Sequence, residues 1–222
     1  MASVVKFILQ SSRKFNYFEI MELIIESHYF SPLIFYKNSF DYTNIQFEQY
    51  ESFQKMSFRN RCVIAGANGK IILSIPLQNG RDQKTLIKDV KISGTQRWQK
   101  DHWKTIESCY NKSPWFEFYK NELQQLYSKQ FTFLLDWNLA CFEWSIDKLN
   151  MPKTHSLTAE FLKNYDEDFE DWRNKILPKN YEEFESVKYR QVFEDRTGFF
   201  PNLSILDLLF CDGKNARELL AS

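Results

Sequence analysis

Residues 61–77 constrain the fold more strongly than any other stretch of the chain. Two runs rich in β-branched residues, RCVIAG and IILSIPL, flank a turn that contains Asn68 and Gly69. An Asn-Gly pair readily adopts the backbone conformation of a tight hairpin turn, so the sequence predicts a β-hairpin here. The turn sequence GANGK lacks the serine or threonine of a phosphate-binding loop, and a strand rather than a helix follows it, which argues against nucleotide binding at this loop.

Short apolar runs and helical spacing of apolar residues predict the other elements of the fold. Strands are expected at 22–27, 43–50, 87–93 and 153–161. Helices are expected at 31–40, 95–112, 114–126, 131–149 and 202–212, with a solvated helix and a loop within 163–190. Strands followed by helices, with a late return to a strand, predict an α/β or α+β fold: a mixed sheet with a β-hairpin, packed by about five helices.

The length and composition of the chain predict one domain. It has 222 residues, of which 43% are hydrophobic, enough for a substantial core. No internal repeat is visible, and with only six glycines and six prolines there is no marked linker. We therefore expect residues 1–20 to be an N-terminal extension and residues 21–222 to form a single domain.

The charge and cysteine content restrict the partners and the compartment. Lysine and arginine together number 29, as do aspartate and glutamate, so no basic excess points to nucleic acid. No apolar run is long enough to span a bilayer, and the N-terminus makes a poor signal peptide. The four cysteines are widely spaced and the three histidines are scattered, so we expect reduced thiols, no metal, no cofactor and a cytoplasmic protein.

The sequence Arg59-Asn60-Arg61 is the most distinctive polar motif. In an extended strand both arginines would point to one face and Asn60 to the other. Two neighbouring guanidinium groups suit a carboxylate or a phosphate, and two interpretations stay open. One is a structural ion-pair network with nearby acids. The other is a polar cleft at strand ends that binds an anionic small molecule and is lined by Arg59, Arg61, Glu26, His28 and Glu48.

Two further polar residues lie on predicted buried helix faces. His102 is spaced four residues from Trp98 and from Ile106, which fits either a hydrogen-bonded core histidine or a proton carrier at a pocket wall. Asn138 lies between Leu135 and Phe142 on the buried stripe of its helix. Its amide needs partners there, and both structural pairing and ligand recognition satisfy that need.

Four segments carry a resemblance to a known family: HYFSPLIFYKNSF, FRNRCVI, WQKDHWKTIESCYNKSPWF and YRQVFEDRTGFFPNLSILDLLFCDG. On these segments the chain resembles the WbqC-like protein family from about Glu22 to the C-terminus, and it looks most like the shorter members of Bacteroidetes-type bacteria. The resemblance implies a role in O-antigen or other surface-polysaccharide biosynthesis, for which glycine transfer has been suggested. Members often have glutamine where this chain has His28, which argues against a glutamine-dependent role.

Two functional hypotheses follow. The first is a transferase that passes an aminoacyl or acyl group to a sugar precursor, with His102 or His28 accepting the proton and Glu26 or Glu48 orienting the histidine. Its substrate-binding residues would be Arg59, Asn60, Arg61, Tyr29, Phe30, Glu48 and Asn138, with the two aromatic rings forming a wall. The second hypothesis is a non-catalytic module that binds a sugar, a nucleotide or a partner protein.

Overall fold

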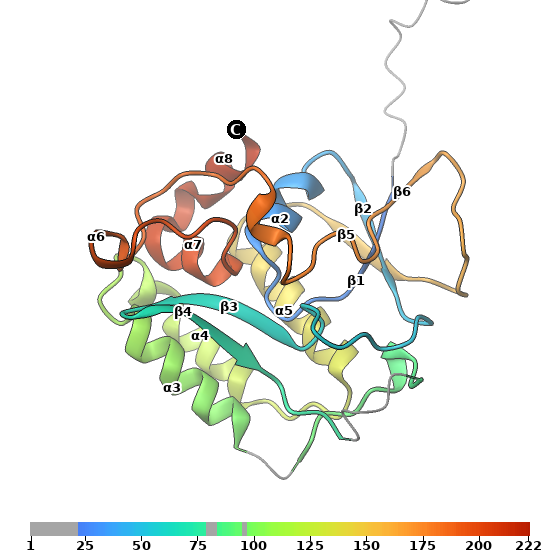
Figure 1. Ribbon diagram of the computed structural model, residues 1–222, viewed down its shortest axis with the longest axis horizontal. Coiled ribbons are helices and arrows are strands. Elements are labelled where there is room, and N and C mark those ends of the chain that lie inside the picture. The colour runs from blue at the N-terminus through green and yellow to red at the C-terminus, as the bar shows by residue number, and fades with distance from the viewer. Residues whose placement is uncertain (1–21, 79–83, 95–96) are drawn as a thin grey trace, which may run out of the picture.

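A parallel sheet with the strand order β5–β2–β1–β6 forms one part of the molecule (Figure 1). The computed structural model describes residues 22–78, 84–94 and 97–222, so the predicted extension 1–20 lies outside the described residues. The strands are β1 (Glu22–Glu26), β2 (Asn44–Glu48), β5 (Thr154–Leu157) and β6 (Phe169–Asp171). The central β1 is apolar on both faces and deeply buried, as expected of a strand inside a parallel sheet.

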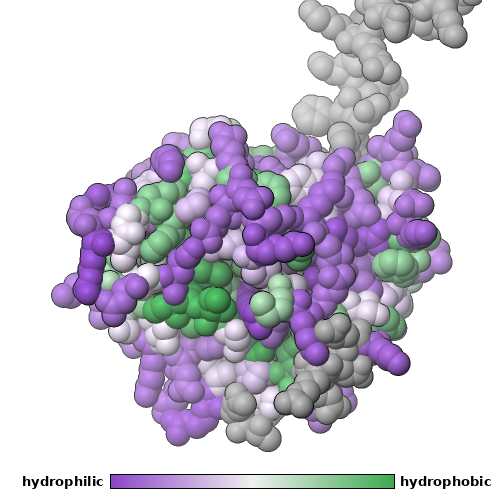
Figure 2. All heavy atoms as spheres, viewed as in Figure 1, coloured by the Kyte–Doolittle hydropathy of each residue, from purple (hydrophilic) through white to green (hydrophobic). Residues whose placement is uncertain are grey.

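An antiparallel hairpin forms a second, separate sheet. Strands β3 (Arg61–Gly66) and β4 (Gly69–Ser74) pair from Arg61↔Ser74 to Gly66↔Gly69, which confirms the predicted hairpin. Gly69 has φ +127°, a conformation that favours glycine. The visible face of the molecule is mostly hydrophilic, with an apolar area over the hairpin (Figure 2), where the side chain of Ile72 is 59% exposed. Parallel and antiparallel pairing thus occur in different sheets of the same fold.

Helices surround the two sheets, and the helices predicted at 31–40, 95–112, 114–126, 131–149 and 202–212 are confirmed. They are α2 (Leu33–Ser39), α3 (Trp98–Tyr110), α4 (Phe116–Ser128), α5 (Leu134–Lys148) and α7 (Ile205–Asp212), with the short α6 (Glu194–Thr197) and α8 (Ala216–Ala221) near the C-terminus. Helices α3 and α4 contact each other, and α7 contacts α4, α2 and strand β3 (Figure 1). The α/β fold expected from the sequence is therefore the observed one. In the described part of the chain, no helix has the length and apolar character needed to cross a membrane.

Two predicted segments differ from the structure. Residues 87–93 were expected to form an edge strand, but Ile87–Asp89 is a 3₁₀ turn, and the rest makes only isolated bridges through Lys91 and Ile92. Residues 163–190 were expected to form a helix and a loop, yet they contain strand β6. β6 has three residues without alternating polarity, and it forms because β1 offers it a pairing edge. Tertiary context overrides local pattern in such short segments.

Candidate functional site: a polar pocket at the carboxyl ends of the parallel strands

Three neighbouring parallel strands end on a carboxylic acid at the same edge of the sheet. β1 ends on Glu26, β2 on Glu48 and β6 on Asp171. The register aligns Glu26 with Glu48 and Ile24 with Asp171, so the three acids lie close to one another. Open α/β sheets place ligands outside the carboxyl ends of their strands, which makes this edge the place to look for a site.

Arg173, just after β6, ties two of these strand ends to the loop 158–168. Its guanidinium group donates to both carboxylate oxygens of Asp171, with the shortest distance 2.6 Å, and to Oε2 of Glu48 at 3.2 Å. Its remaining N–H groups reach the backbone oxygens of Leu162, at 2.8 Å, and Lys163, at 3.4 Å. All five N–H donors of the guanidinium group are therefore engaged within the protein.

Arg59 forms a second, fully buried ion-pair cluster beside the first. Its Nε and Nη2 donate to the two carboxylate oxygens of Glu51 at 2.8 and 2.7 Å, and Nη2 also donates to Oδ1 of Asn174 at 2.9 Å. Nη1 lies 3.6 Å from Oε1 of Glu26, and Nε2 of His28 lies 3.3 Å from the same oxygen. One buried guanidinium group is thus shared between two carboxylates.

The two carboxylates that share Arg59 have opposite pKa shifts. Burial acts to raise the pKa of Glu26, but Arg59 and His28 outweigh it and hold that pKa at about 2. Burial raises the pKa of Glu51 to about 7, against the attraction of Arg59 and with the help of the negative charge on Glu26. Glu51 is therefore the carboxyl group of this cluster that exchanges a proton near neutral pH.

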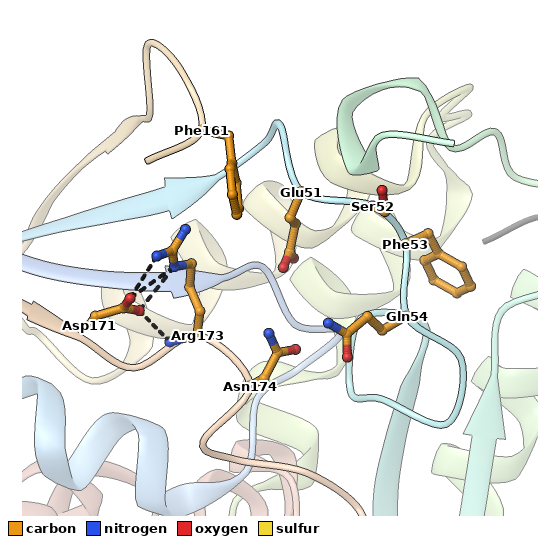
Figure 3. A pocket seen from close by; sticks show the side chains of 8 residues that line it. All are labelled: Glu51, Ser52, Phe53, Gln54, Phe161, Asp171, Arg173 and Asn174. Carbon is orange, nitrogen blue, oxygen red and sulfur yellow. Dashed lines mark hydrogen bonds and ion pairs between the residues drawn. The ribbon is translucent and has the colours of Figure 1, made fainter. Parts of the chain in front are cut away.

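A pocket of about 530 Å³ opens directly beside these clusters (Figure 3). Its wall joins the loop after β2, the loop after β5 and the residues after β6, and it consists of Glu51, Ser52, Phe53, Gln54, Phe161, Asp171, Arg173 and Asn174. Asn174 has φ +59°, a left-handed conformation. This conformation lets its backbone N–H donate to Oε2 of Glu26 at 2.8 Å while its side chain accepts from Arg59.

The charges around the pocket favour hydroxyl or amine groups over anions in a ligand. Carboxyl groups outnumber guanidinium groups here: Glu26, Glu48, Glu51 and Asp171 against Arg59 and Arg173. Arg173 lines the pocket with every donor engaged, and Arg59 lies behind Glu51 with its side chain fully buried. An entering phosphate would meet acidic groups before it met an available cation.

Several buried polar atoms behind the pocket have no hydrogen-bond partner among the described residues. They are Oε1 of Glu26, both ring nitrogens of His28 and Nη1 of Arg59. Their separations of 3.3 and 3.6 Å are within ion-pair range, but they do not have the geometry of a hydrogen bond. Such atoms are rare in native proteins, and here they are held by charge attraction at ion-pair distances instead of by hydrogen bonds.

Four of the five residues predicted to line one polar cleft lie near one another, but they are buried behind the pocket and none of them is part of its wall. Glu26, His28, Glu48 and Arg59 gather at the carboxyl ends of the parallel strands. Arg61 does not join them. It begins β3, is partly exposed, and places Nη1 3.4 Å from Sδ of Met56.

The paired-arginine clamp is absent because Arg59 precedes β3 in a turn, so the alternation of a strand does not apply to it. Asn60 between the two arginines is used structurally. Its side-chain amide donates to the backbone oxygen of Ile75 at 3.0 Å. The predicted clamp of Arg59 and Arg61 around one anion is therefore replaced by a single buried arginine held by the protein's own acids.

His102 lies in a different part of the core, together with the predicted aromatic wall. The hydroxyl of Tyr29 is 3.0 Å from Nδ1 of His102 and 2.5 Å from the hydroxyl of Tyr127. Phe30 packs against Tyr29 and Tyr127 and is also buried. Burial lowers the pKa of His102 to about 4, so the ring is neutral at physiological pH. Tyr29, Phe30 and His102 therefore form a core cluster and are not part of the pocket wall.

Asn138 supports the site from behind. Its Nδ2 donates to the backbone oxygen of Arg59 at 2.8 Å and lies 3.3 Å from that of Ser27. The amide thus fixes the two segments that carry Arg59 and His28. Of the two interpretations of Asn138, the structure shows the structural pairing.

Sequence reasoning missed every residue of the pocket wall. Glu51 and Gln54 follow β2 in a segment with no periodic pattern. Asp171 ends the unrecognised strand β6, and Arg173 and Asn174 follow it. A usable signal was present in the endings of the strands ELIIE, NIQFE and FED, each of which closes on an acid. Recognising FED as a strand would have brought Arg173 and Asn174 to the same edge.

We expect His102→Ala to affect stability and not ligand binding at the pocket. The change removes a buried hydrogen bond and a ring, and the free energy of unfolding should fall by about 2–4 kcal/mol. Urea unfolding measures this loss, and calorimetry on the folded variant measures binding. A stable His102→Ala protein that fails to bind a ligand of the wild type would show that this expectation is wrong.

The comparisons with known proteins identify the family. A model of the WbqC-like protein family matches residues 26–179, a range that includes every residue of the pocket wall. The C-terminal segment 189–213, on which the resemblance also rested, lies beyond the matched range. Searches of curated proteins and of solved structures gave no match. Because the matched range covers well over half of the chain, this protein belongs to the WbqC-like family.

Proposed function

We propose that this protein is a transferase of bacterial surface-polysaccharide biosynthesis, which passes an aminoacyl or acyl group to a sugar precursor bound in the pocket. One observation carries the proposal: Glu51, with a pKa near 7, stands in the wall of a polar pocket at the carboxyl ends of parallel strands. A carboxyl group with such a pKa can accept and release a proton at working pH. The family resemblance supports the polysaccharide setting.

The proposed reaction assigns a role to Glu51 in each proton transfer. An amine or hydroxyl of the sugar attacks the carbonyl carbon of the donor, and the Glu51 carboxylate accepts the proton of that group. The new N–C or O–C bond forms as the bond between the carbonyl carbon and the leaving group breaks. Glu51 then returns the proton to the leaving group, which departs as its neutral conjugate acid.

The buried neighbours of Glu51 set its position and its pKa. Arg59 holds the carboxylate through two hydrogen bonds, and Asn174 and Glu26 hold Arg59 in turn. This arrangement fixes one rotamer of Glu51 at the pocket wall. Fixed geometry of the proton acceptor is what general-base catalysis requires.

We expect transfer to depend on Glu51 and on pH. Only the deprotonated carboxyl group accepts a proton, so kcat/KM should rise as the pH increases through about 7. Glu51→Gln should lower the rate by roughly 10²–10⁴-fold and remove this pH dependence. The assay incubates the protein with acyl and aminoacyl thioesters and methyl glycosides of amino sugars, and mass spectrometry detects the acylated sugar.

The matched control is Glu182→Gln, which changes a surface carboxylate paired with Lys70. It should leave the rate and the pH profile unchanged. A Glu51→Gln protein with the wild-type rate across the pH range would contradict the assignment of Glu51.

A non-catalytic binding module is the second candidate, and the separation of the histidines favours it. His28 and His102 are both buried, one beside Arg59 and the other among tyrosines, so no histidine lines the pocket. Under this alternative, amino sugars raise the melting temperature by mass action but no acylated product forms with any donor. Thermal shift and product detection on the same samples separate the two candidates.

A further inference from the structure

Phe161 stands at the mouth of the pocket with much of its ring uncovered. It is one of the pocket-lining residues, it points into the space between Arg173 and Glu51 (Figure 3), and it is 52% exposed. Exposing a phenyl ring costs hydrophobic free energy, and among the described phenylalanines only Phe161 and Phe118 are exposed. A ring left exposed at the edge of a polar pocket is suited to contact a ligand.

The exposed ring is held in place and is not a loose surface side chain. The guanidinium carbon of Arg173 lies 5.0 Å from the ring centroid of Phe161 and 4.9 Å from that of Tyr165. Arg173 is itself fixed by Asp171, Glu48 and two backbone oxygens of the same loop. The ring of Phe161 therefore contacts a fixed cation while about half of the residue stays exposed.

The pocket wall across from the ring carries side chains that can form hydrogen bonds with a ligand. The amide of Gln54, the Nδ2 group of Asn174 and the hydroxyl of Ser52 line the pocket, and none of them has a side-chain hydrogen-bond partner among the described residues. Amides donate and accept at once, as neighbouring sugar hydroxyls require. The carboxyl group of Glu51 adds an acceptor for a hydroxyl or a cationic amine.

We propose that the pocket recognises the pyranose ring of an amino sugar, which stacks its C–H face on Phe161 and turns its polar groups toward Glu51, Gln54 and Asn174. The C–H groups on one face of a pyranose carry partial positive charge, and they meet the electron-rich face of the phenyl ring. The acidic surroundings favour an amine and disfavour a diphosphate, so the sugar itself is bound and the nucleotide is not. This inference rests on the proposed function, because it names the acceptor of that reaction.

The test measures binding of defined sugars by isothermal titration calorimetry. The probes are methyl β-glucosaminide, methyl β-glucoside and a nucleoside diphosphate without a sugar. The glucosaminide should bind best, the glucoside more weakly and the diphosphate not at all. Phe161→Leu should weaken binding of the glucosaminide by about 5–10-fold, whereas Phe161→Trp should preserve it.

Two variants separate stacking from other effects. Tyr165→Leu removes the other ring from Arg173 but leaves the pocket wall intact, and it should cost less affinity than Phe161→Leu. Phe118→Leu changes a phenylalanine on α4 that is 70% exposed and lies outside the pocket wall, and it should have no effect. Melting temperatures confirm that each variant is folded.

The outcomes distinguish this inference from the proposed function. Phe161-dependent binding of the glucosaminide without transfer from any donor supports the inference and rejects the transferase. Transfer with an unchanged KM for the sugar in Phe161→Leu supports the transferase and rejects the inference. Equal affinity of wild type and Phe161→Leu, tighter binding of the diphosphate than of the glycoside, or no binding of either glycoside overturns the inference.

Discussion

Replacing Arg59 with alanine is expected to lower the free energy of unfolding by about 3–5 kcal/mol. The change leaves Glu26 and Glu51 buried next to each other without the guanidinium group that separates their charges. It also removes the hydrogen bond from Arg59 to the side chain of Asn174 and leaves a cavity where a fully buried arginine stood. Chemical unfolding in urea at pH 7 measures the effect.

Two companion variants test whether charge is the cause. Arg59→Lys keeps a positive charge but cannot hold Glu51 through two parallel hydrogen bonds, so its stability should lie between those of wild type and alanine variant. Adding Glu51→Gln to Arg59→Ala removes one unpaired carboxylate and should restore part of the loss. An Arg59→Ala protein as stable as the wild type would contradict a stabilising role of the buried ion pair. Lys70→Ala, in a surface ion pair, is the control with little expected change.

Arg173→Ala should have the second-largest effect, because it acts on stability and on the pocket together. We expect a loss of about 2–4 kcal/mol, since Glu48 is fully buried and loses its cationic partner. Glu48 keeps hydrogen bonds from the backbone of Tyr50 and the hydroxyl of Thr158, which limits the loss.

The same variant should release the loop 158–168, which Arg173 holds through Leu162 and Lys163. Limited proteolysis should cut this loop faster in Arg173→Ala than in the wild type, and ligand binding should be lost because Phe161 is no longer positioned. Arg173→Lys should behave like alanine, since an ammonium group cannot replace the planar five-donor group. Arg190→Ala removes an arginine from an exposed ion pair and should leave the cleavage pattern unchanged. Identical cleavage of all four proteins would contradict the anchoring role of Arg173.

Local sequence pattern was sufficient for most of the fold. The hairpin β3–β4 carries an explicit turn signal, and α3, α4 and α5 carry helical spacing, so both types of element are encoded by neighbouring residues. β6 and the turn at Ile87–Asp89 are not encoded in this way. Their conformations depend on partners distant in the sequence, which a single sequence does not reveal.

Part of the candidate site was predictable, because two of the recognised strands end on an acid. Glu26 and Glu48 were found because β1 and β2 were recognised, and His28 and Arg59 because of their unusual surroundings. The arginines were wrongly paired because a turn, not a strand, carries Arg59. Glu51 was missed because its pKa arises from burial and from Glu26, and neither is visible in the residues beside it.

The position of Arg59 in the chain has a consequence for the whole molecule. It stands at the entry to the hairpin, yet it is held by Glu26 at the end of the parallel sheet, so the same ion pairs join the two sheets and form the back of the pocket. We therefore expect pocket occupancy and cohesion between the sheets to be thermodynamically linked. A compound that binds only the intact pocket should also stabilise the contact between the hairpin and the parallel sheet. Binding in the pocket should therefore slow amide hydrogen exchange in β3.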